Sequence, residues 1–120
     1  MYETSDRLYN IAEFIKRKAF EKDGETLKAA SKAILTFNKG IIDAICDVVP
    51  AIKPQAAYYE MYGYHGVKTL YKTIQYAKEK GMFVMTDGKR NDIGATMEAY
   101  ATAHLGTTIV GSEELDAFGA

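Results

Sequence analysis

The sequence predicts an α/β fold in which amphipathic helices pack against a parallel sheet. Helical patterns alternate with short apolar runs in the order helix, strand, helix, strand, helix, and glycine or proline stands at most boundaries. Parallel strands joined through a helix are the usual outcome of such alternation. Two strands alone make a poor sheet, so we expect the chain to form part of a larger α/β architecture.

Two helices are expected before the first strand. The first has apolar residues at helical spacing, namely Ile11, Phe14, Ile15 and Ala19. Gly24 is expected to end it soon after Lys22. The second helix spans 25–48 and repeats the pattern, with Gly40 as its weak point.

A short strand is expected at residues 51–53, because Pro50 and Pro54 bracket an apolar run that is too punctuated for a helix interior. A further helix spans 65–80 and is followed by a glycine at the usual capping position. Residues 81–86 then form the second strand.

The remainder of the chain is expected to be helical. One helix covers 95–104 and ends at Gly106, and a last short helix covers 112–118. No repeat, low-complexity tract or flexible linker interrupts the sequence, so residues 1–120 are expected to form one domain. Another strand would be due where the sequence ends.

Composition and charge exclude several classes of partner. The chain has 15 basic and 16 acidic residues and a net charge of -1, so no broad attraction to nucleic acid or to a membrane surface is expected. The N-terminus has no long apolar core, which argues against a signal peptide or a membrane span. The single Cys46 fits a reducing compartment, and we expect a cytoplasmic protein.

Charged residues gather where the two expected strands end. Asp87 and Lys89 are two residues apart, so in an extended chain they point to the same side of the sheet, and Asp92 can fold back from the loop. Lys53 lies near the end of the other strand. In α/β barrels the catalytic residues lie at the C-terminal ends of the strands. We therefore expect these residues to form a catalytic cluster rather than a solvated ion pair.

The residue types in this cluster favour one kind of reaction. A lysine flanked by two aspartates stays protonated while the carboxylates stay ionised, because opposite charges favour one another. Such a group suits the loss of a neutral molecule from an anionic substrate, since the ammonium can stabilise the resulting carbanion and then protonate it. That reaction is decarboxylation.

Three segments resemble orotidine 5'-phosphate decarboxylase in its bacterial type 2 branch: 37–43, 51–55 and above all 87–96. The likeness extends from about Glu3 to Ala120. It implies that the chain is the N-terminal portion of a (β/α)8 TIM barrel, with about two parallel strands and flanking helices. It also implies conversion of orotidine 5'-phosphate to uridine 5'-phosphate, in pyrimidine biosynthesis, without a cofactor or a metal.

The resemblance assigns roles to the clustered residues. Lys89 would protonate C6 of the pyrimidine, and Asp87 would face the departing carboxylate and hold Lys89 in line. Lys53 would join the hydrogen-bond chain to the ribose, and Glu3 stands where the family has an acidic ribose ligand.

The resemblance also implies a homodimer. Asp92 and Thr96 would reach across the interface to the partner's site, with Ile93 close to them. The family's first strand is expected to precede Glu3, and strands four to eight to follow Ala120. Those later strands hold the phosphate-gripping residues, so we expect the 120 residues alone to be a fragment with little or no activity.

Two alternatives stay open at this point. One is a magnesium-dependent sugar-phosphate decarboxylase or synthase of the same suprafamily, against which Arg90, Thr96 and the segment 92–94 argue. The other is a noncatalytic fragment that self-associates through the uncovered edges and faces of its incomplete barrel. His65 and His104 lack neighbouring ligands at metal-binding spacing, and the nine tyrosines are expected to pack rather than to stack on bases.

Overall fold

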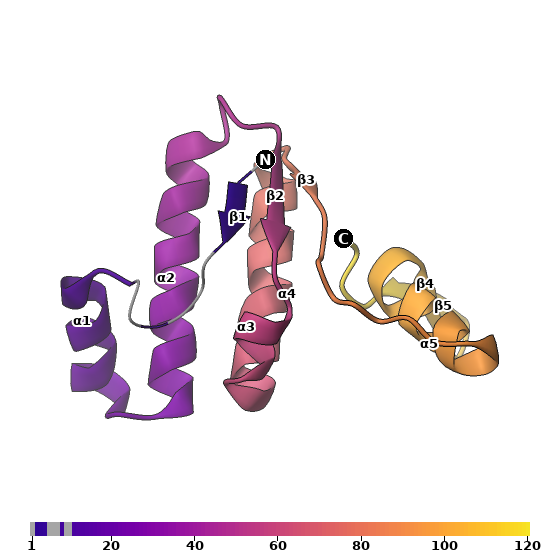
Figure 1. The fold of residues 1–120 in the computed structure, drawn as a ribbon, viewed down its shortest axis with the longest axis horizontal. Helices are drawn as coiled ribbons and strands as arrows, with labels where there is room; N and C mark the ends of the chain where they lie inside the picture. The colour runs from indigo at the N-terminus through magenta and orange to yellow at the C-terminus, as the bar shows by residue number, and fades with distance from the viewer. Residues whose placement is uncertain (1, 5–7, 9–10) are drawn as a thin grey trace.

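The computed structural model describes residues 2–4, 8 and 11–120. The helices and strands alternate along most of the chain (Figure 1), and they are β1 (Tyr2–Thr4), α1 (Glu13–Asp23), α2 (Leu27–Ile45), β2 (Ala51–Pro54), α3 (Ala57–Glu60), α4 (Gly63–Glu79), β3 (Phe83–Val84), α5 (Gly94–Leu105), β4 (Thr107–Val110) and β5 (Glu113–Asp116). The α/β class is therefore confirmed. No helix in the described part of the chain combines the length and the apolar character needed to cross a membrane.

The parallel sheet contains one strand more than the sequence analysis expected. Its order is β1-β2-β3, and both neighbouring pairs are parallel. β1 pairs with β2 so that Glu3 lies opposite Lys53. The expectation that a first strand would precede Glu3 is wrong, because Glu3 itself lies inside β1. This strand is short and polar, so its hydrogen bonding to β2, rather than an apolar run, defines it.

The helices α1, α2 and α4 stand in a row beside the sheet (Figure 1), with α2 packed between the other two. Thr26 caps the N-terminus of α2, because its hydroxyl accepts a hydrogen bond from the Ala29 amide at 3.1 Å. The apolar residues of α2 and α4 recur at helical spacing and form the core together with the inner face of β2. The most deeply buried aliphatic side chains are Ile34, Ile42, Ile52, Leu70 and Ile74.

The core also contains a buried polar contact. The Asn38 amide of α2 donates to the Tyr59 hydroxyl at 2.9 Å and to the Thr73 hydroxyl at 3.2 Å. These bonds link α2 to α3 and α4, and each satisfies a group that would be costly to bury alone. Tyr59 and Tyr62 are buried, as expected for packing tyrosines, whereas Tyr64 is 74% exposed.

The end of the chain differs from the sequence expectation. Residues 112–118 do not form a helix; instead β4 and β5 pair as an antiparallel hairpin in which Val110 lies opposite Glu113. Gly111 has a φ of 65° and opens the two-residue turn, which is a conformation that favours glycine. The β-branched run before this glycine favours a strand, and the helix prediction overlooked that signal.

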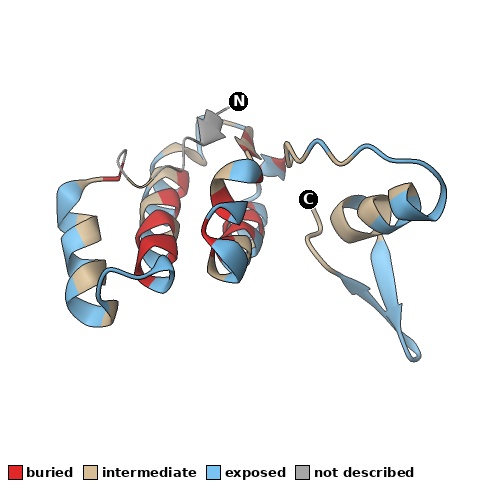
Figure 2. Cartoon of the chain, turned by 60° about the horizontal axis from the view of Figure 1, so that its bottom comes forward, coloured by how far each residue is buried: buried red, intermediate tan, exposed pale blue. Residues whose placement is uncertain are grey.

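Burial is unevenly distributed along the chain (Figure 2). The buried residues concentrate in α2, α4 and the strands β2 and β3, whereas α5 contains none and β4 and β5 are exposed throughout. The candidate site lies at the junction of these two regions, in the segment that links β3 to α5.

Candidate functional site

The segment after β3 stays paired with β2 beyond the formal end of the strand. The amides of Phe83, Met85 and Asp87 donate in turn to β2-side carbonyls at 2.8, 3.0 and 3.0 Å. These three residues share one side of the ladder because strand side chains alternate. Phe83 and Met85 are exposed, while Val84 faces the helices and is buried. Asp87 therefore extends the face of the sheet that the helices leave uncovered.

β2 shows the same division of faces. Ile52 and Pro54 are buried, and Lys53 between them is only half-buried. Lys53 thus lies on the uncovered face, near the end of its strand. The backbone of Asp87 is held there because the Ala56 amide donates to the Asp87 carbonyl at 3.0 Å, and Gln55 forms a parallel bridge with Asp87.

The Asp87 carboxylate lies between two lysines. Lys89 Nζ donates to Asp87 Oδ1 at 2.9 Å, and Lys53 Nζ donates to Asp87 Oδ2 at 3.2 Å. The expectation that Lys53 and Asp87 share one rim is confirmed. The arrangement within one chain is nevertheless an aspartate between two lysines, and not a lysine between two aspartates.

The two ammonium groups stabilise the charged form of this carboxylate. The hydrogen bond from Lys89, followed by that from Lys53, holds the pKa of Asp87 below its ordinary value of 3.8. Asp87 is therefore ionised at neutral pH, and the three side chains together carry one net positive charge. A cluster with that charge attracts an anionic ligand.

Lys89 adopts an unusual backbone conformation. Its φ of 48° is in the left-handed region, and it is the one non-glycine residue in the described part of the chain with a positive φ. The contact with Asp87 therefore does not come from an extended strand, as the two-residue spacing suggested, but from a turn that brings the ammonium back. Strain of this kind persists where the surrounding structure holds it, and it is common at functional sites.

Arg90 holds this turn against two helices. Its guanidinium pairs with the Glu60 carboxylate of α3, donates to the Gly88 carbonyl and lies 5.9 Å from the centre of the Tyr100 ring of α5. Sequence reasoning missed Glu60 and Tyr100 as supports of the site. No local pattern points to Glu60, since 30 residues separate it from Arg90.

The remaining motif residues lie outside the cluster. Asp92 does not fold back onto Lys89; its Oδ1 accepts the amide of Ile93 at 2.8 Å, and the side chain is exposed. Ile93 is 85% exposed, and Thr96 is exposed on the first turn of α5. The backbone of Glu3 lies opposite Lys53, but its side chain falls outside the described residues. The fold-back expected for Asp92 is therefore wrong within a single chain.

A cavity of about 190 Å³ adjoins the turn between β3 and α5. Its lining includes Thr86, Lys89, Arg90, Tyr100 and His104. In the described part of the chain, the Thr86 hydroxyl and His104 Nδ1 are buried without a hydrogen-bond partner. Burial, and then the charge of Arg90, lower the pKa of His104. His104 is therefore neutral at pH 7, and its ring stacks on Phe118 at 4.7 Å between centroids.

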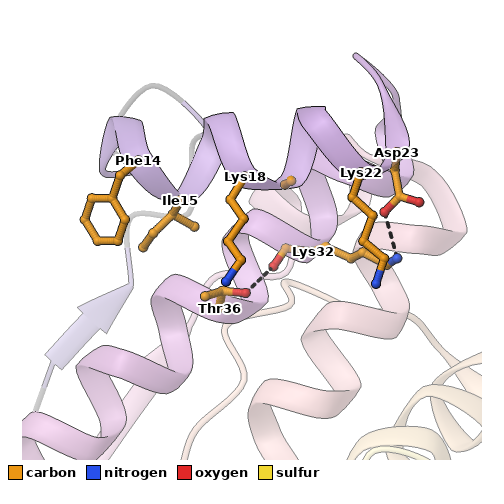
Figure 3. A pocket seen from close by; sticks show the side chains of 8 residues that line it. Phe14, Ile15, Lys18, Lys22, Asp23, Lys32 and Thr36 are labelled. Carbon is orange, nitrogen blue, oxygen red and sulfur yellow. Dashed lines mark hydrogen bonds and ion pairs between the residues drawn. The ribbon is translucent and has the colours of Figure 1, made fainter.

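A second cavity, of about 310 Å³, lies between α1 and α2 (Figure 3). Phe14 and Ile15 form its apolar side, and Lys18, Lys22 and the Asp23–Lys32 ion pair surround the rest. Its lining includes none of the residues that the sequence predicts for the catalytic or binding site. Across the described residues, no three His, Cys, Asp or Glu side chains are grouped so that they could hold a metal ion.

Comparisons with known proteins agree with the motif. The model of the "Orotidine 5'-phosphate decarboxylase / HUMPS family" matches residues 29–113. The chain is 36% identical over 101 residues to the orotidine 5'-phosphate decarboxylase of Caldicellulosiruptor saccharolyticus, with 84% of this chain and 33% of the relative covered. It is 42% identical over 101 residues to the corresponding protein of Rhodopirellula baltica, with 84% and 32% covered.

A solved structure is also similar. A crystal structure from Streptomyces avermitilis, provisionally named an orotidine 5'-phosphate decarboxylase, superimposes with a TM-score of 0.60 at 32% identity. The match covers 77% of this chain and 38% of that one. The chain thus spans about a third of the length of the curated relatives it matches, 33% and 32% in the two cases above. Its three parallel strands and flanking helices have the arrangement of part of a TIM barrel.

Proposed function

The chain belongs to the orotidine 5'-phosphate decarboxylase / HUMPS family, and from this membership we propose that it contributes to the decarboxylation of orotidine 5'-phosphate to uridine 5'-phosphate in pyrimidine biosynthesis. One observation carries the proposal. The Asp87 carboxylate lies between the ammonium groups of Lys53 and Lys89, on the uncovered face at the ends of parallel strands. Strand ends of this kind hold the reacting groups in α/β barrels.

The proposed chemistry follows from these charges. The net positive cluster attracts the anionic substrate, and Asp87 faces the substrate carboxylate. When the C6–carboxylate bond breaks, carbon dioxide leaves and the electron pair stays on C6. The Lys89 ammonium stabilises this carbanion and then gives it a proton, which completes uridine 5'-phosphate. Lys53 holds Asp87 from the other side and contacts the ribose, with Glu3 as a further ribose ligand.

The proposal assigns Asp92, Ile93 and Thr96 to a second subunit's site. All three are exposed, and in the described part of the chain the Asp92 carboxylate accepts a hydrogen bond only from the Ile93 amide. An acid supplied by a partner would place Lys89 between two carboxylates, which is the arrangement that the motif implies. We therefore propose a homodimer, in the cytoplasm, that binds a nucleotide and neither nucleic acid nor membrane.

Residues 1–120 form the N-terminal portion of the catalytic barrel in this proposal. Binding of the remote phosphate supplies much of the catalytic power in reactions of this kind. Since the chain spans about a third of the length of its curated relatives, we expect the 120 residues alone to show little or no turnover. The proposed decarboxylation uses neither a cofactor nor a metal.

The decisive experiment is a titration of the chain with a uridine 5'-phosphate analogue that bears an anionic C6 substituent. We expect saturable binding that Lys89→Ala and Lys53→Ala each weaken at least tenfold, because each change removes a positive charge that attracts the anionic ligand. Arg17→Gln, on the exposed side of α1, is the matched control and should leave binding unchanged. Absence of binding at millimolar analogue, or equal binding by all variants, would contradict the proposed site.

The same samples discriminate the magnesium-dependent alternative within the family. A sugar-phosphate decarboxylase or synthase would need added magnesium to bind its phosphate ligand and would lose that binding in chelator, whereas binding of the uridine 5'-phosphate analogue by the proposed site is indifferent to both. Size measurement in the absence of ligand tests whether the chain merely self-associates. A dimer that binds no analogue would support the noncatalytic alternative.

A further inference from the structure

A groove between α2 and α4 contains an unusual concentration of positive charge. It has a volume of about 420 Å³, and the residues that matter for its chemistry are Lys28, Ser31 and Lys32 of α2 and His65, Lys68 and Lys72 of α4. The two lysines on each helix are four residues apart, so each pair lies on one face of its helix. We refer to the four lysines and Ser31 as the lysine groove. None of its residues belongs to the cluster around Asp87.

The positive charge of the lysine groove is largely uncompensated. Asp23 is the one acidic partner in the described part of the chain: its Oδ2 lies 2.7 Å from Lys32 Nζ and its Oδ1 lies 3.6 Å from Lys28 Nζ (Figure 3 shows the first pair). No described carboxylate lies within ion-pairing distance of Lys68 or Lys72. Four cations against one carboxylate leave an excess of three positive charges, which repel one another unless an anion binds.

A buried hydroxyl in the same groove lacks a partner. Ser31 is 3% exposed, and in the described part of the chain its Oγ makes no hydrogen bond. The nearby Thr69 hydroxyl donates to the Ser31 backbone carbonyl at 3.0 Å, and so does not satisfy the Ser31 side chain. Buried polar groups in proteins are normally paired, and an unpaired hydroxyl that lines a charged groove is available to donate to a bound anion.

We propose that the lysine groove binds a small polyphosphate anion. Lysine ammonium groups bind phosphate oxygens as point charges, and a hydroxyl can donate to the same oxygens. A triphosphate matches the excess of three charges more closely than a single phosphate does. The groove is also of the size that holds a small molecule. The ligand is either an inorganic polyphosphate or the triphosphate of a nucleotide, and the exposed Tyr64 ring at the same groove is available to stack on a base.

Calorimetric titration with sodium tripolyphosphate tests the proposal. We expect saturable binding that weakens at least tenfold in the double variant Lys68→Gln, Lys72→Gln and weakens as ionic strength rises. The matched control, Arg17→Gln with Lys39→Gln, removes the same charge from α1 and α2 outside the groove and should bind as the parent does. Absence of binding at millimolar tripolyphosphate, or equal loss in both double variants, would overturn the proposal.

Three further variants sharpen the result. Ser31→Ala removes the unpaired hydroxyl, so we expect unfolding stability to be kept while tripolyphosphate binding weakens several-fold; unchanged binding would overturn the role of this hydroxyl. Lys53→Gln with Lys89→Gln removes the cations of the proposed decarboxylase site and should leave tripolyphosphate binding intact. The proposal for the lysine groove is therefore tested independently of the proposed decarboxylase site. Tighter binding of a nucleoside triphosphate than of tripolyphosphate, lost in Tyr64→Ala, would identify a nucleotide, and equal binding would identify the phosphate chain alone.

Discussion

The chain contains two regions that fold by different means. Residues 27–84 hold the buried core, in which α2 and α4 pack on each other and on β2 (Figure 2). Residues 94–120 contain no buried residue. They keep their shape through the hydrogen bonds within α5 and the hairpin, and through a few contacts of the chain end, such as the bond from Gln75 to the Phe118 carbonyl at 2.8 Å.

This difference does not come from a lack of apolar residues in α5. Alanine, methionine, tyrosine and leucine occur all around α5, whereas in α2 and α4 the apolar residues gather on one face. A helix with one apolar face needs one neighbour, and a helix that is apolar all round needs several. The first region is therefore stabilised by its own packing, and the second depends on further cover. The following predictions test this contrast.

The largest expected effect is loss of core packing. Ile74→Ala, at a fully buried position of α4, should lower the free energy of unfolding by about 2–5 kcal/mol. The same kind of truncation in the second region, Leu105→Ala, should change the free energy of unfolding by less than about 0.5 kcal/mol, because Leu105 is 79% exposed. Urea denaturation followed by circular dichroism measures both. Similar costs at the two positions would refute the contrast.

A smaller effect is expected from the polar contact inside the core. Asn38→Ala removes the donor to Tyr59 and Thr73, so two buried hydroxyls lose a partner, at a cost of about 1–3 kcal/mol in unfolding free energy. Thr36→Ala on the exposed side of the same helix is the control and should cost much less. Equal costs would show that the contact contributes nothing beyond helix propensity.

A local effect is expected in the hairpin. Gly111→Ala forces a side chain into the left-handed region and should cost about 1 kcal/mol, although the space around Gly111 is open. Because the second region packs loosely, hydrogen exchange should speed up in β4 and β5 and stay unchanged in α2 and α4. Faster exchange in α4 would show that the two regions unfold together.

The smallest effect concerns the junction between the regions and depends on pH. The pKa of Asp87 is lowered, so its ion pairs stabilise the folded chain at pH values above 3.8, the ordinary pKa of an aspartate. This stabilisation is lost as the pH falls through the lowered pKa of the folded state. The difference in unfolding free energy between the parent and Asp87→Asn should therefore shrink as the pH falls from about 5 to about 2. A constant difference over this range would contradict the pairing.

The sequence by itself determined the parts of the molecule that follow from local periodicity. The apolar spacing in 27–45 and 63–79 is sufficient for α2 and α4, because a helix repeats every 3.6 residues and its buried face can be read directly. The proline-bracketed run predicted β2, and the motif at residues 87–96 indicated the family. The roles of Asp92, Ile93, Thr96 and Glu3 stay predictions.

Only the tertiary structure decided which distant groups meet. Lys53 contacts Asp87 across 34 residues, and Arg90 contacts Glu60 across 30, and no local pattern encodes either pair. β1 exists because β2 supplies its hydrogen-bonding partners, and the left-handed turn at Lys89 exists because Asp87 and the flanking helices hold it. Local spacing limits the conformation of each segment, but contacts between segments depend on how the sheet and its helices pack in three dimensions.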